Sequence, residues 1–502
     1  MSFTLYLALG TITSYVLWQI FVALKDPLRD VPGPTIARIT RLWYWYRAWR
    51  GEWNWDVVDL HRKYDSKIVR YAPGQYSISD PDAIKPIHGY GADFDKAPIY
   101  VAWNPPGFKG LFNEPKSDAH AAIRKKYTSM YAMSSVSQYE QYVDECLDIF
   151  CKRLEGHEGR QIDLLWELHC FAMDAVGLLT FGKRFGYLDN AEDIGNIAKN
   201  VLAVAKYATL MGIVHELHKP YYWVMSFWGK LTQRSGTAKL YLNKFALETI
   251  KQRKQERSSD FKKGDDGVGP VSMLDKFLDA NDSDPQQFTM HHVMVGLAGN
   301  IVAGSDTTSA TMTAAMYYLT KDPAALSELR SQMDARGSND FVSLRDIQGS
   351  DLAYTQAVVT EALRLWPQTG LGLPRIIPPT GATILGQYFP PDTVVTMSSW
   401  ASHYDSDNFE DPYSFKPERW LIPDKEAKDR MNRAYFPFGL GSRNCIGKNV
   451  AMLVMQKAVP ELAKRFDFEL AGNLGQGEEL QASDYFVIRP VKMPVVVRKR
   501  IV

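Results

Sequence analysis

Apolar residues recur along most of the chain with the spacing of helices rather than of strands. Ile162 to Arg257 and Phe288 to Leu319 follow this pattern, and Asn449 to Phe466 is a further apolar helical run. Ile68 to Ser79 alternates as strands do, with a turn at Pro73-Gly74. The pattern predicts a mainly α-helical fold with small β-sheets.

The N-terminus differs from the rest, because Phe3 to Leu24 contains no charged residue. At about 1.5 Å per residue, this run covers a hydrocarbon core of about 30 Å. It lacks the basic start and the small-residue cleavage site of a signal peptide. Basic residues follow it, which indicates a cytoplasmic main body (Lys25, Arg29, Arg38 and Arg41). We therefore expect an uncleaved transmembrane anchor over 1–25, with an N-terminal core helix as the alternative.

Three further segments stand out by composition. Val31-Pro32-Gly33-Pro34 breaks any helix, so we expect a proline-rich hinge over 26–45 and one globular domain over 46–502. Pro220 to Trp228 is strongly apolar and aromatic, and core packing is its expected role, with a surface that dips into a membrane as the alternative. Ser258 to Gln287 begins with linker composition, which predicts an exposed loop.

Charge and cysteine content narrow the class of protein. Lys and Arg total 58 against 57 Asp and Glu, so no overall field would draw nucleic acid. The four cysteines include no C-x-x-C pair, which argues against a disulfide scaffold or a zinc site and indicates folding in a reducing compartment.

One cysteine has a distinctive setting. Cys445 lies in a glycine-rich loop that leads directly into an apolar helix. Glycines allow close approach to a flat ligand, and the start of a helix stabilises a thiolate. A thiolate binds metals, and haem iron held by cysteine favours cleavage of an O–O bond. Taken alone, the loop leaves a buried cysteine in a tight turn as the alternative.

Polar residues within helices mark other candidate sites. Asp306 and Thr307 lie in Ala303 to Thr308, where glycine, acid and threonines cost helix propensity. Both a kink with room for a small ligand and an intact helix with internally bonded hydroxyls remain open. His120 and Arg124 are spaced for one helical face, although a solvated helix face is the better explanation of such a pair taken in isolation.

Together these segments resemble the signature motifs of the cytochrome P450 family, in order along essentially the whole chain. Phe438, Gly441, Arg443, Cys445 and Gly447 fill F-x-x-G-x-R-x-C-x-G. Residues 303–308 fill A-G-x-D-T-T, Glu361 and Arg364 fill E-x-x-R, and P-E-R-W ends at Trp420 where P-E-R-F is commoner. The region from Gly370 to Trp420 is most similar to fungal pisatin-demethylase-type members, which oxidise secondary metabolites.

The resemblance implies a P450 fold and haem b (iron protoporphyrin IX), with Cys445 as the iron ligand and a haem-binding monooxygenase domain over 46–502. Asp306 and Thr307 would deliver protons during oxygen activation. Glu361, Arg364 and Arg419 would form a buried structural triad. The remaining cofactor-binding residues by resemblance are His120 (where tryptophan is commoner), Arg124, Arg375, Phe438 and Arg443, of which the arginines suit the haem propionates.

The implied activity is insertion of one oxygen atom from O2 into a hydrophobic small molecule at the endoplasmic reticulum membrane. Electrons would come from an NADPH–cytochrome P450 reductase, with cytochrome b5 as a second candidate donor. The candidate docking residues are Lys125, Lys126 and Lys448, with simply solvated lysines as the alternative. A haem-thiolate isomerase or dehydratase and a non-catalytic haem sensor are the alternatives, and the Asp306–Thr307 pair argues against both. Substrate-pocket candidates, chosen by location alone, are Tyr100, Trp103, Val302, Leu371, Leu373, Tyr485 and Phe486.

Overall fold

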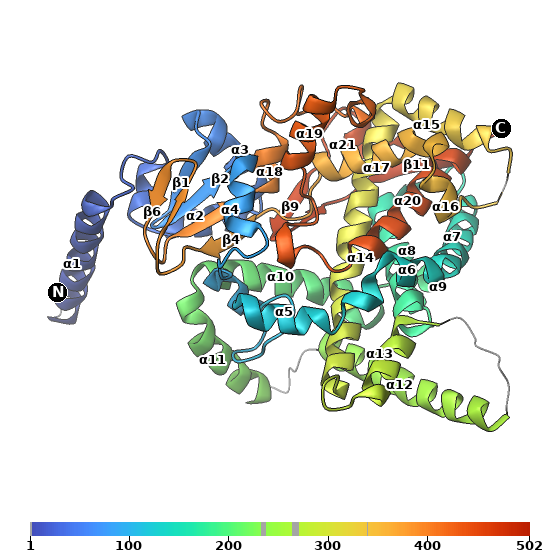
Figure 1. Cartoon of the computed structure of the whole chain (residues 1–502), viewed down its shortest axis with the longest axis horizontal. Helices are drawn as coiled ribbons and strands as arrows, with labels where there is room; N and C mark the ends of the chain where they lie inside the picture. Colours follow the sequence, from blue (N-terminus) through green and yellow to red (C-terminus); the bar gives the residue numbers. More distant parts are fainter. Residues whose placement is uncertain (1–2, 232–236, 264–270, 339, 502) are drawn as a thin grey trace.

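The computed structural model describes residues 3–231, 237–263, 271–338 and 340–501. Helices dominate it, as the apolar spacing predicts (Figure 1). The α-helices are α1 (Phe3–Lys25), α2 (Leu42–Arg50), α3 (Trp53–Tyr64), α4 (Ile84–His88), α5 (Ser117–Lys125), α6 (Met133–Val136), α7 (Glu140–Glu155), α8 (Leu164–Phe181), α9 (Tyr187–Asn190), α10 (Ile197–Ile213), α11 (His218–Leu231), α12 (Thr237–Lys263), α13 (Met273–Ser283), α14 (Met290–Lys321), α15 (Pro323–Ala335), α16 (Leu344–Ile347), α17 (Ala353–Leu365), α18 (Ser399–His403), α19 (Lys425–Ala434), α20 (Lys448–Arg465) and α21 (Gly472–Gly475).

The strands form small sheets, the largest of which has four strands in the order β1-β2-β7-β4. In this sheet β2 runs parallel to β7, and the other pairs are antiparallel. A three-stranded sheet has the order β3-β11-β8, and β5–β6 and β9–β10 are two-stranded. The strands are β1 (Ile68–Ala72), β2 (Gln75–Ile78), β3 (Gln161–Asp163), β4 (Leu373–Ile376), β5 (Ala382–Ile384), β6 (Gln387–Phe389), β7 (Val394–Met397), β8 (Phe466–Leu470), β9 (Ala482–Tyr485), β10 (Val487–Pro490) and β11 (Pro494–Lys499).

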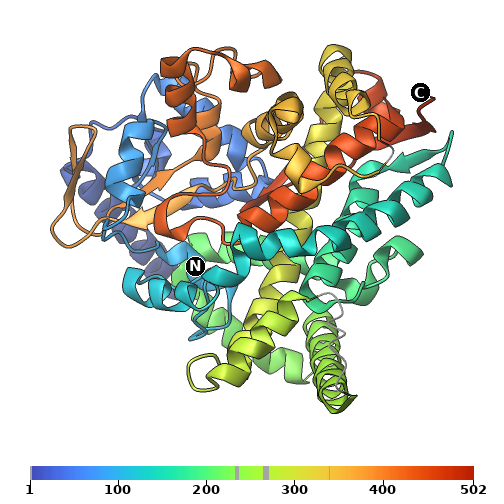
Figure 2. The ribbon, with the colours of Figure 1, turned by 45° about the vertical axis from the view of Figure 1, so that its right-hand side comes forward.

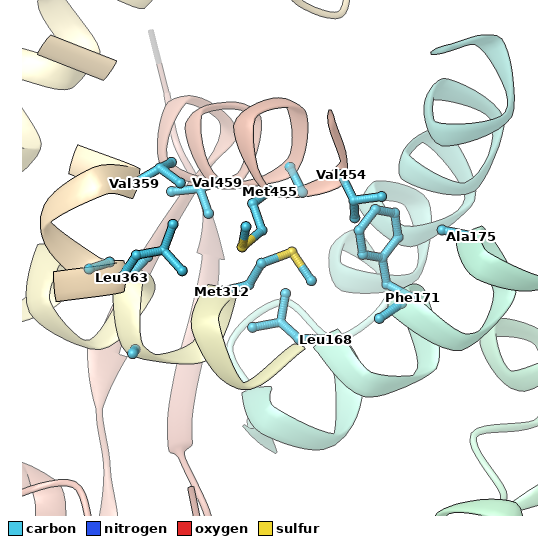
Figure 3. Packing of buried hydrophobic residues seen from close by; sticks show 14 of the residues in the cluster. Leu168, Phe171, Ala175, Met312, Val359, Leu363, Val454, Met455 and Val459 are labelled. Atoms are coloured by element: carbon cyan, nitrogen blue, oxygen red, sulfur yellow. The ribbon is translucent and has the colours of Figure 1, made fainter. Parts of the chain in front are cut away.

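The core is built around α14, which runs through the middle of the helical body in both views (Figures 1 and 2). It packs against α8, α17 and α20. Apolar side chains from these helices interdigitate there, among them Leu168, Met312, Leu363 and Met455 (Figure 3). Helix α8 is long and apolar enough to cross a membrane, but almost all of it is buried in this core. A helix that is apolar on all sides requires such burial.

Helix α14 is unbroken from its cap at Thr289 to Lys321. The hydroxyls of Ser305 and Thr307 donate to the carbonyls of Ile301 and Ala303, at 3.0 and 2.7 Å. Of the two alternatives that the sequence leaves open, the intact helix is therefore the one found, and the polar residues are accommodated by bonds to the preceding turn.

At the N-terminus, α1 projects from the body (Figure 1), and the segment after it docks on β1. Arg70 donates to the Asp26 carboxylate at 2.6 Å and to the carbonyl of Leu28 at 2.7 Å. The start of the predicted hinge is therefore fixed to the body through a buried guanidinium.

Two sequence expectations are wrong. The aromatic run from Pro220 to Trp228 lies on α11 and is largely exposed, with Trp223 at 59% and Phe227 at 66%, so core packing is not its role. The predicted loop is largely helical, because α12 continues to Lys263 and α13 occupies Met273–Ser283. Residues 264–270 of that loop, including the Gly264 to Gly267 part of its linker motif, lie outside the described residues.

Candidate functional site

The cysteine loop is held in shape by its backbone. The Cys445 N–H donates to the carbonyl of Phe438 at 2.7 Å, and Gly439 takes a φ of +77° that favours glycine. Gly441 also has a positive φ, and a Cβ there would collide with the backbone oxygen of His88. Close backbone approach therefore requires glycine at position 441 of the motif, and the positive φ favours it at position 439.

The cysteines differ in accessibility. Cys146, Cys151 and Cys170 are buried, and burial raises the pKa of the Cys170 thiol to about 12. Cys445 is accessible, although dense surrounding protein still raises the pKa of its thiol by burial. The backbone N–H of Gly447 and the charges of Arg124 and Lys448 act in the opposite direction. The backbone N–H of Gly447, next to the start of α20, therefore acts in the direction that favours a thiolate, and a bound metal cation would favour it further.

Basic side chains from four segments gather beside this loop. His120 and Arg124 come from α5, Arg375 from β4 and Arg443 from the loop, and Lys96 joins them through a bridge between its backbone and that of Arg375. Arg124 donates to the carbonyl and side-chain oxygens of Asn444 at 2.7 and 2.6 Å, and Arg443 donates to the carbonyls of Glu114 and Pro115 at 2.7 and 2.6 Å.

These groups repel one another. Burial, with Arg443 the foremost neighbouring charge, lowers the pKa of His120 to about 3. Burial and Arg375 lower the pKa of Arg443 to about 10. Among the described residues, no carboxylate forms an ion pair with any of the five basic groups. Buried charges normally have partners, so the cluster fits a ligand that brings its own carboxylates, as the two propionates of haem do.

Two members of this neighbourhood were missed by sequence reasoning. Lys96 is 6% exposed, donates to the carbonyl of Phe112, and has a pKa lowered by burial and by Arg375. His88 is buried, and its Nε2 has no hydrogen-bond partner among the described residues. Neither residue belongs to a motif. Only the β4 bridge at Lys96 and the contact of His88 with the glycine loop bring them to the site.

Asp306 and Thr307 lie on α14, beside Val302, which is 39% exposed. Thr307 is half-buried, whereas Asp306 is 8% exposed. Burial alone would raise the pKa of the Asp306 carboxyl, but contact with His169 and the charge of Arg489 outweigh it, so the pKa lies below its usual value. The acid is therefore ionised and buried next to a more accessible alcohol.

The structural triad is confirmed. Glu361 accepts hydrogen bonds from Arg364 at 2.8 and 2.9 Å and from Arg419 at 3.0 Å. The indole N–H of Trp420 donates to the same carboxylate at 2.9 Å. Each oxygen of this fully buried carboxylate thus has at least two donors, and the tryptophan of P-E-R-W supplies one of them.

The structure brings some of the pocket candidates together. The ring of Phe486 lies 5.9 Å from that of Tyr100 and 5.2 Å from that of Trp103, and Phe112, which the sequence did not single out, contacts all three at 5.4–5.6 Å. The hydroxyl of Tyr485 donates to the carbonyl of Trp49 at 3.2 Å. Leu371 is buried and Leu373 is half-buried.

Comparison with known proteins agrees with the family that the sequence motifs resemble. A sequence model described as Cytochrome P450 matches residues 31–494. A pisatin demethylase of Fusarium vanettenii is 33% identical over 469 residues, which cover 92% of this chain and 87% of that protein. A cytochrome P450 monooxygenase of Aspergillus terreus is 32% identical over 88% of this chain and 90% of its own, and cytochrome P450 monooxygenase gsfF of Penicillium aethiopicum is 31% identical over 96% of both.

Among solved structures, the haem domain of cytochrome P450DA superposes with a TM-score of 0.72 at 18% identity, over 89% of this chain and 92% of that chain. At this identity the likeness shows the fold, which confirms the predicted P450 architecture. The family in turn implies haem as the cofactor. With the family model spanning nearly the whole chain and relatives above 30% identity over about nine-tenths of it, the protein belongs to the cytochrome P450 family and is a cytochrome P450 monooxygenase.

Proposed function

We propose that this P450 inserts one oxygen atom from O2 into a hydrophobic small molecule of fungal secondary metabolism, with electrons from an NADPH-dependent reductase. The observation that carries the proposal is the intact Asp306–Thr307 pair on unbroken α14. When bound, haem supplies the activation of dioxygen. Named fungal relatives that are P450 monooxygenases support the same class of reaction.

The basic cluster would hold the cofactor in one orientation. His120, Arg124, Arg375 and Arg443 would bind its propionates, joined by Lys96, while Cys445 would ligate its iron through sulfur. Phe438 would support the haem ring, and its carbonyl accepts the hydrogen bond that fixes the Cys445 backbone. Planar guanidinium groups suit paired carboxylate oxygens.

Proton handling would fall to the α14 pair. Asp306 is ionised at neutral pH, so it can accept a proton from the solvent side and pass it on. The Thr307 hydroxyl, which donates to the Ala303 carbonyl, can accept a further hydrogen bond and order a water chain. An isomerase would need neither residue.

Substrate and membrane contacts would lie on different surfaces. The aromatic group of Tyr100, Trp103, Phe112 and Phe486 offers apolar ring faces and edges to a hydrophobic substrate. Exposed apolar residues on α1 and α11 support attachment to the endoplasmic reticulum membrane. The basic residues Lys125, Lys126 and Lys448 remain candidates for docking an acidic reductase or cytochrome b5.

The test is turnover in a reconstituted system. The protein is incubated with a P450 reductase, NADPH and panels of fungal aromatic and polyketide metabolites, and products are read by mass spectrometry. We expect NADPH-dependent products that carry one additional oxygen atom. Where a methyl group is oxidised and then lost, we expect the demethylated product instead. Cys445→Ser is the control, and it should also lose the thiolate-specific absorption of the reduced carbon monoxide complex. Product formed equally well without NADPH would instead support the isomerase reading.

A further inference from the structure

His169 is a buried histidine that none of the motifs explains. It lies in the interior of α8 and is 1% exposed. Its Nδ1 atom lies 3.0 Å from Oδ1 of Asp306 on α14. The acid of the A-G-x-D-T-T segment therefore has a polar neighbour on a different helix, deep in the core.

The chemistry of the contact requires that Nδ1 of His169 carries a hydrogen. An ionised carboxylate only accepts hydrogen bonds, and the pKa of Asp306 lies below its usual value because the neighbouring basic groups outweigh burial. Two unprotonated acceptors at 3.0 Å would repel each other, so Nδ1 carries hydrogen. Arg489, the other basic neighbour, is 3.9 Å from Oδ2, beyond hydrogen-bond distance. His169 is thus the closest basic partner of this acid.

The ring of His169 is fixed in place by aromatic neighbours. Trp166 stacks on it with centroids 5.2 Å apart and a 19° angle between planes, and Tyr187 meets it edge-on at 6.0 Å. Trp166 is itself held through its indole N–H, which donates to the carbonyl of Ala191 at 2.9 Å. The ring can therefore not swing away from Asp306 without disturbing both neighbours.

Packing alone does not account for a histidine at this position. Neither ring nitrogen makes an aligned hydrogen bond within the described part of the chain, and Oδ1 of Asp306 also lacks one. Buried polar groups without aligned partners cost stability, and an apolar side chain would fill the same space without that cost. Such a costly group next to a buried acid points to a role in controlling that acid.

We propose that His169 is a positioning residue for proton delivery: the 3.0 Å contact of its Nδ1 with Oδ1 of Asp306 attracts the carboxylate into the orientation from which Asp306 passes protons toward Thr307. The inference rests on the proposed oxygen-insertion function. It assigns to α8 a part in the reaction, in addition to its place in the core.

Three variants separate positioning from packing. His169→Asn keeps an N–H donor near the place of Nδ1, whereas His169→Phe keeps an aromatic ring of similar size without any nitrogen. Cys170→Ala changes the neighbouring, equally buried residue of α8 and is the matched control. Each is assayed with reductase and a substrate found in the turnover screen, for product per NADPH consumed and for the solvent deuterium isotope effect on product formation.

We expect His169→Phe to lower product per NADPH by roughly tenfold and to change the isotope effect, because the acid loses its orientation. His169→Asn should retain most of the coupling, and Cys170→Ala all of it. Equal losses in the Asn and Phe variants would overturn the proposal, as would a Phe variant that behaves like Cys170→Ala.

A second measurement needs no turnover. Thermal unfolding midpoints are compared for His169→Phe, Asp306→Ala and the double variant. If the two residues interact, the midpoint shift of the double variant should be smaller than the sum of the shifts of the two single variants. Independent residues would give a double-variant shift equal to that sum. Additive shifts would overturn the proposal, and this readout stands even if the wild-type protein yields no oxygenated product and the proposed function itself fails.

Discussion

At the scale of single residues, burial and charge oppose each other throughout the site. Five basic groups crowd together without carboxylate partners among the described residues, and an ionised acid lies in the core. The motifs single out Cys445, Arg124 and Asp306 in the sequence, and their roles at the site stay predictions. Lys96, His88 and His169 could not be predicted, because distant segments bring them to the site.

Thr307→Ala should uncouple oxygen reduction from product formation. It removes a hydroxyl while leaving Cys445 and the basic cluster intact, so haem content should stay normal. We expect product per NADPH to fall by roughly tenfold, with a matching rise in hydrogen peroxide, since protons arrive with poorer control. Product, peroxide and NADPH are measured in one assay.

The matched control for this change is Thr320→Ala. Its hydroxyl makes the same kind of bond on the same helix, to the Met316 carbonyl at 2.7 Å. It should leave coupling unchanged. A Thr307→Ala enzyme with the wild-type ratio of product to NADPH would remove the hydroxyl from the mechanism.

Asp484 makes the stability of the protein depend on pH. It is fully buried on β9, and burial raises the pKa of its carboxyl to about 7, against the opposing effect of the backbone N–H groups of Asn54 and Phe486. The folded state therefore binds a proton that the unfolded chain releases near pH 4, and stability falls as pH rises from about 4 to 7.

Asp484→Asn removes this penalty. The thermal unfolding midpoint of Asp484→Asn minus that of the wild type should therefore be about 2–4 °C larger at pH 8 than at pH 5. Asp30→Asn, at a side chain that is 94% exposed, is the control and should show no such trend. An Asp484→Asn difference that is equal at both pH values would mean that the carboxyl titrates normally.

At the scale of elements, periodicity predicted α14 and α20 to within a few residues, because their apolar faces pack on neighbouring helices. It misjudged α11, since apolar composition alone does not distinguish a core face from an exposed one. It also could not give a role to the tryptophan of P-E-R-W. In the structure, the indole of Trp420 reaches from η9 (Pro417–Leu421) to Glu361 on α17 and joins these elements.

Trp420→Phe should therefore destabilise the fold. It leaves Glu361 fully buried with one donor fewer, which costs about 1–3 kcal/mol in the free energy of unfolding. Denaturant unfolding measures the loss.

Trp366→Phe is the matched control for packing. Trp366 is 4% exposed, and its indole N–H has no hydrogen-bond partner among the described residues. This variant removes comparable volume without breaking a bond, so it should lose less stability than Trp420→Phe. Equal losses would show that ring packing, and not the hydrogen bond to Glu361, accounts for the Trp420 effect.

At the scale of the whole molecule, apolar surface is exposed on two separate helices. On α1, Trp18 is 60% and Leu24 67% exposed, and α1 stands clear of the body (Figure 1). On α11, Trp223 and Phe227 are similarly exposed, and an apolar groove of about 450 Å³ lies between α2, α10 and α11. A monomer in water rarely exposes so much apolar surface, so both helices would face lipid in the proposed arrangement.

Deleting residues 1–25 should separate the two contributions. If α1 is the anchor, the truncated protein should leave the membrane pellet in high-salt or low-detergent washes that do not release the full chain. Residual binding should come from α11, because tryptophan and phenylalanine favour the interface. Trp223→Ser combined with Phe227→Ser in the truncated chain should therefore abolish this residual membrane binding. Tyr413→Ser, at a side chain that is 53% exposed between α18 and η9, is the control and should not. Flotation with liposomes of neutral and anionic lipids measures both steps. If the truncated protein floats as completely as the full chain both with and without the α11 changes, neither helix is the attachment site.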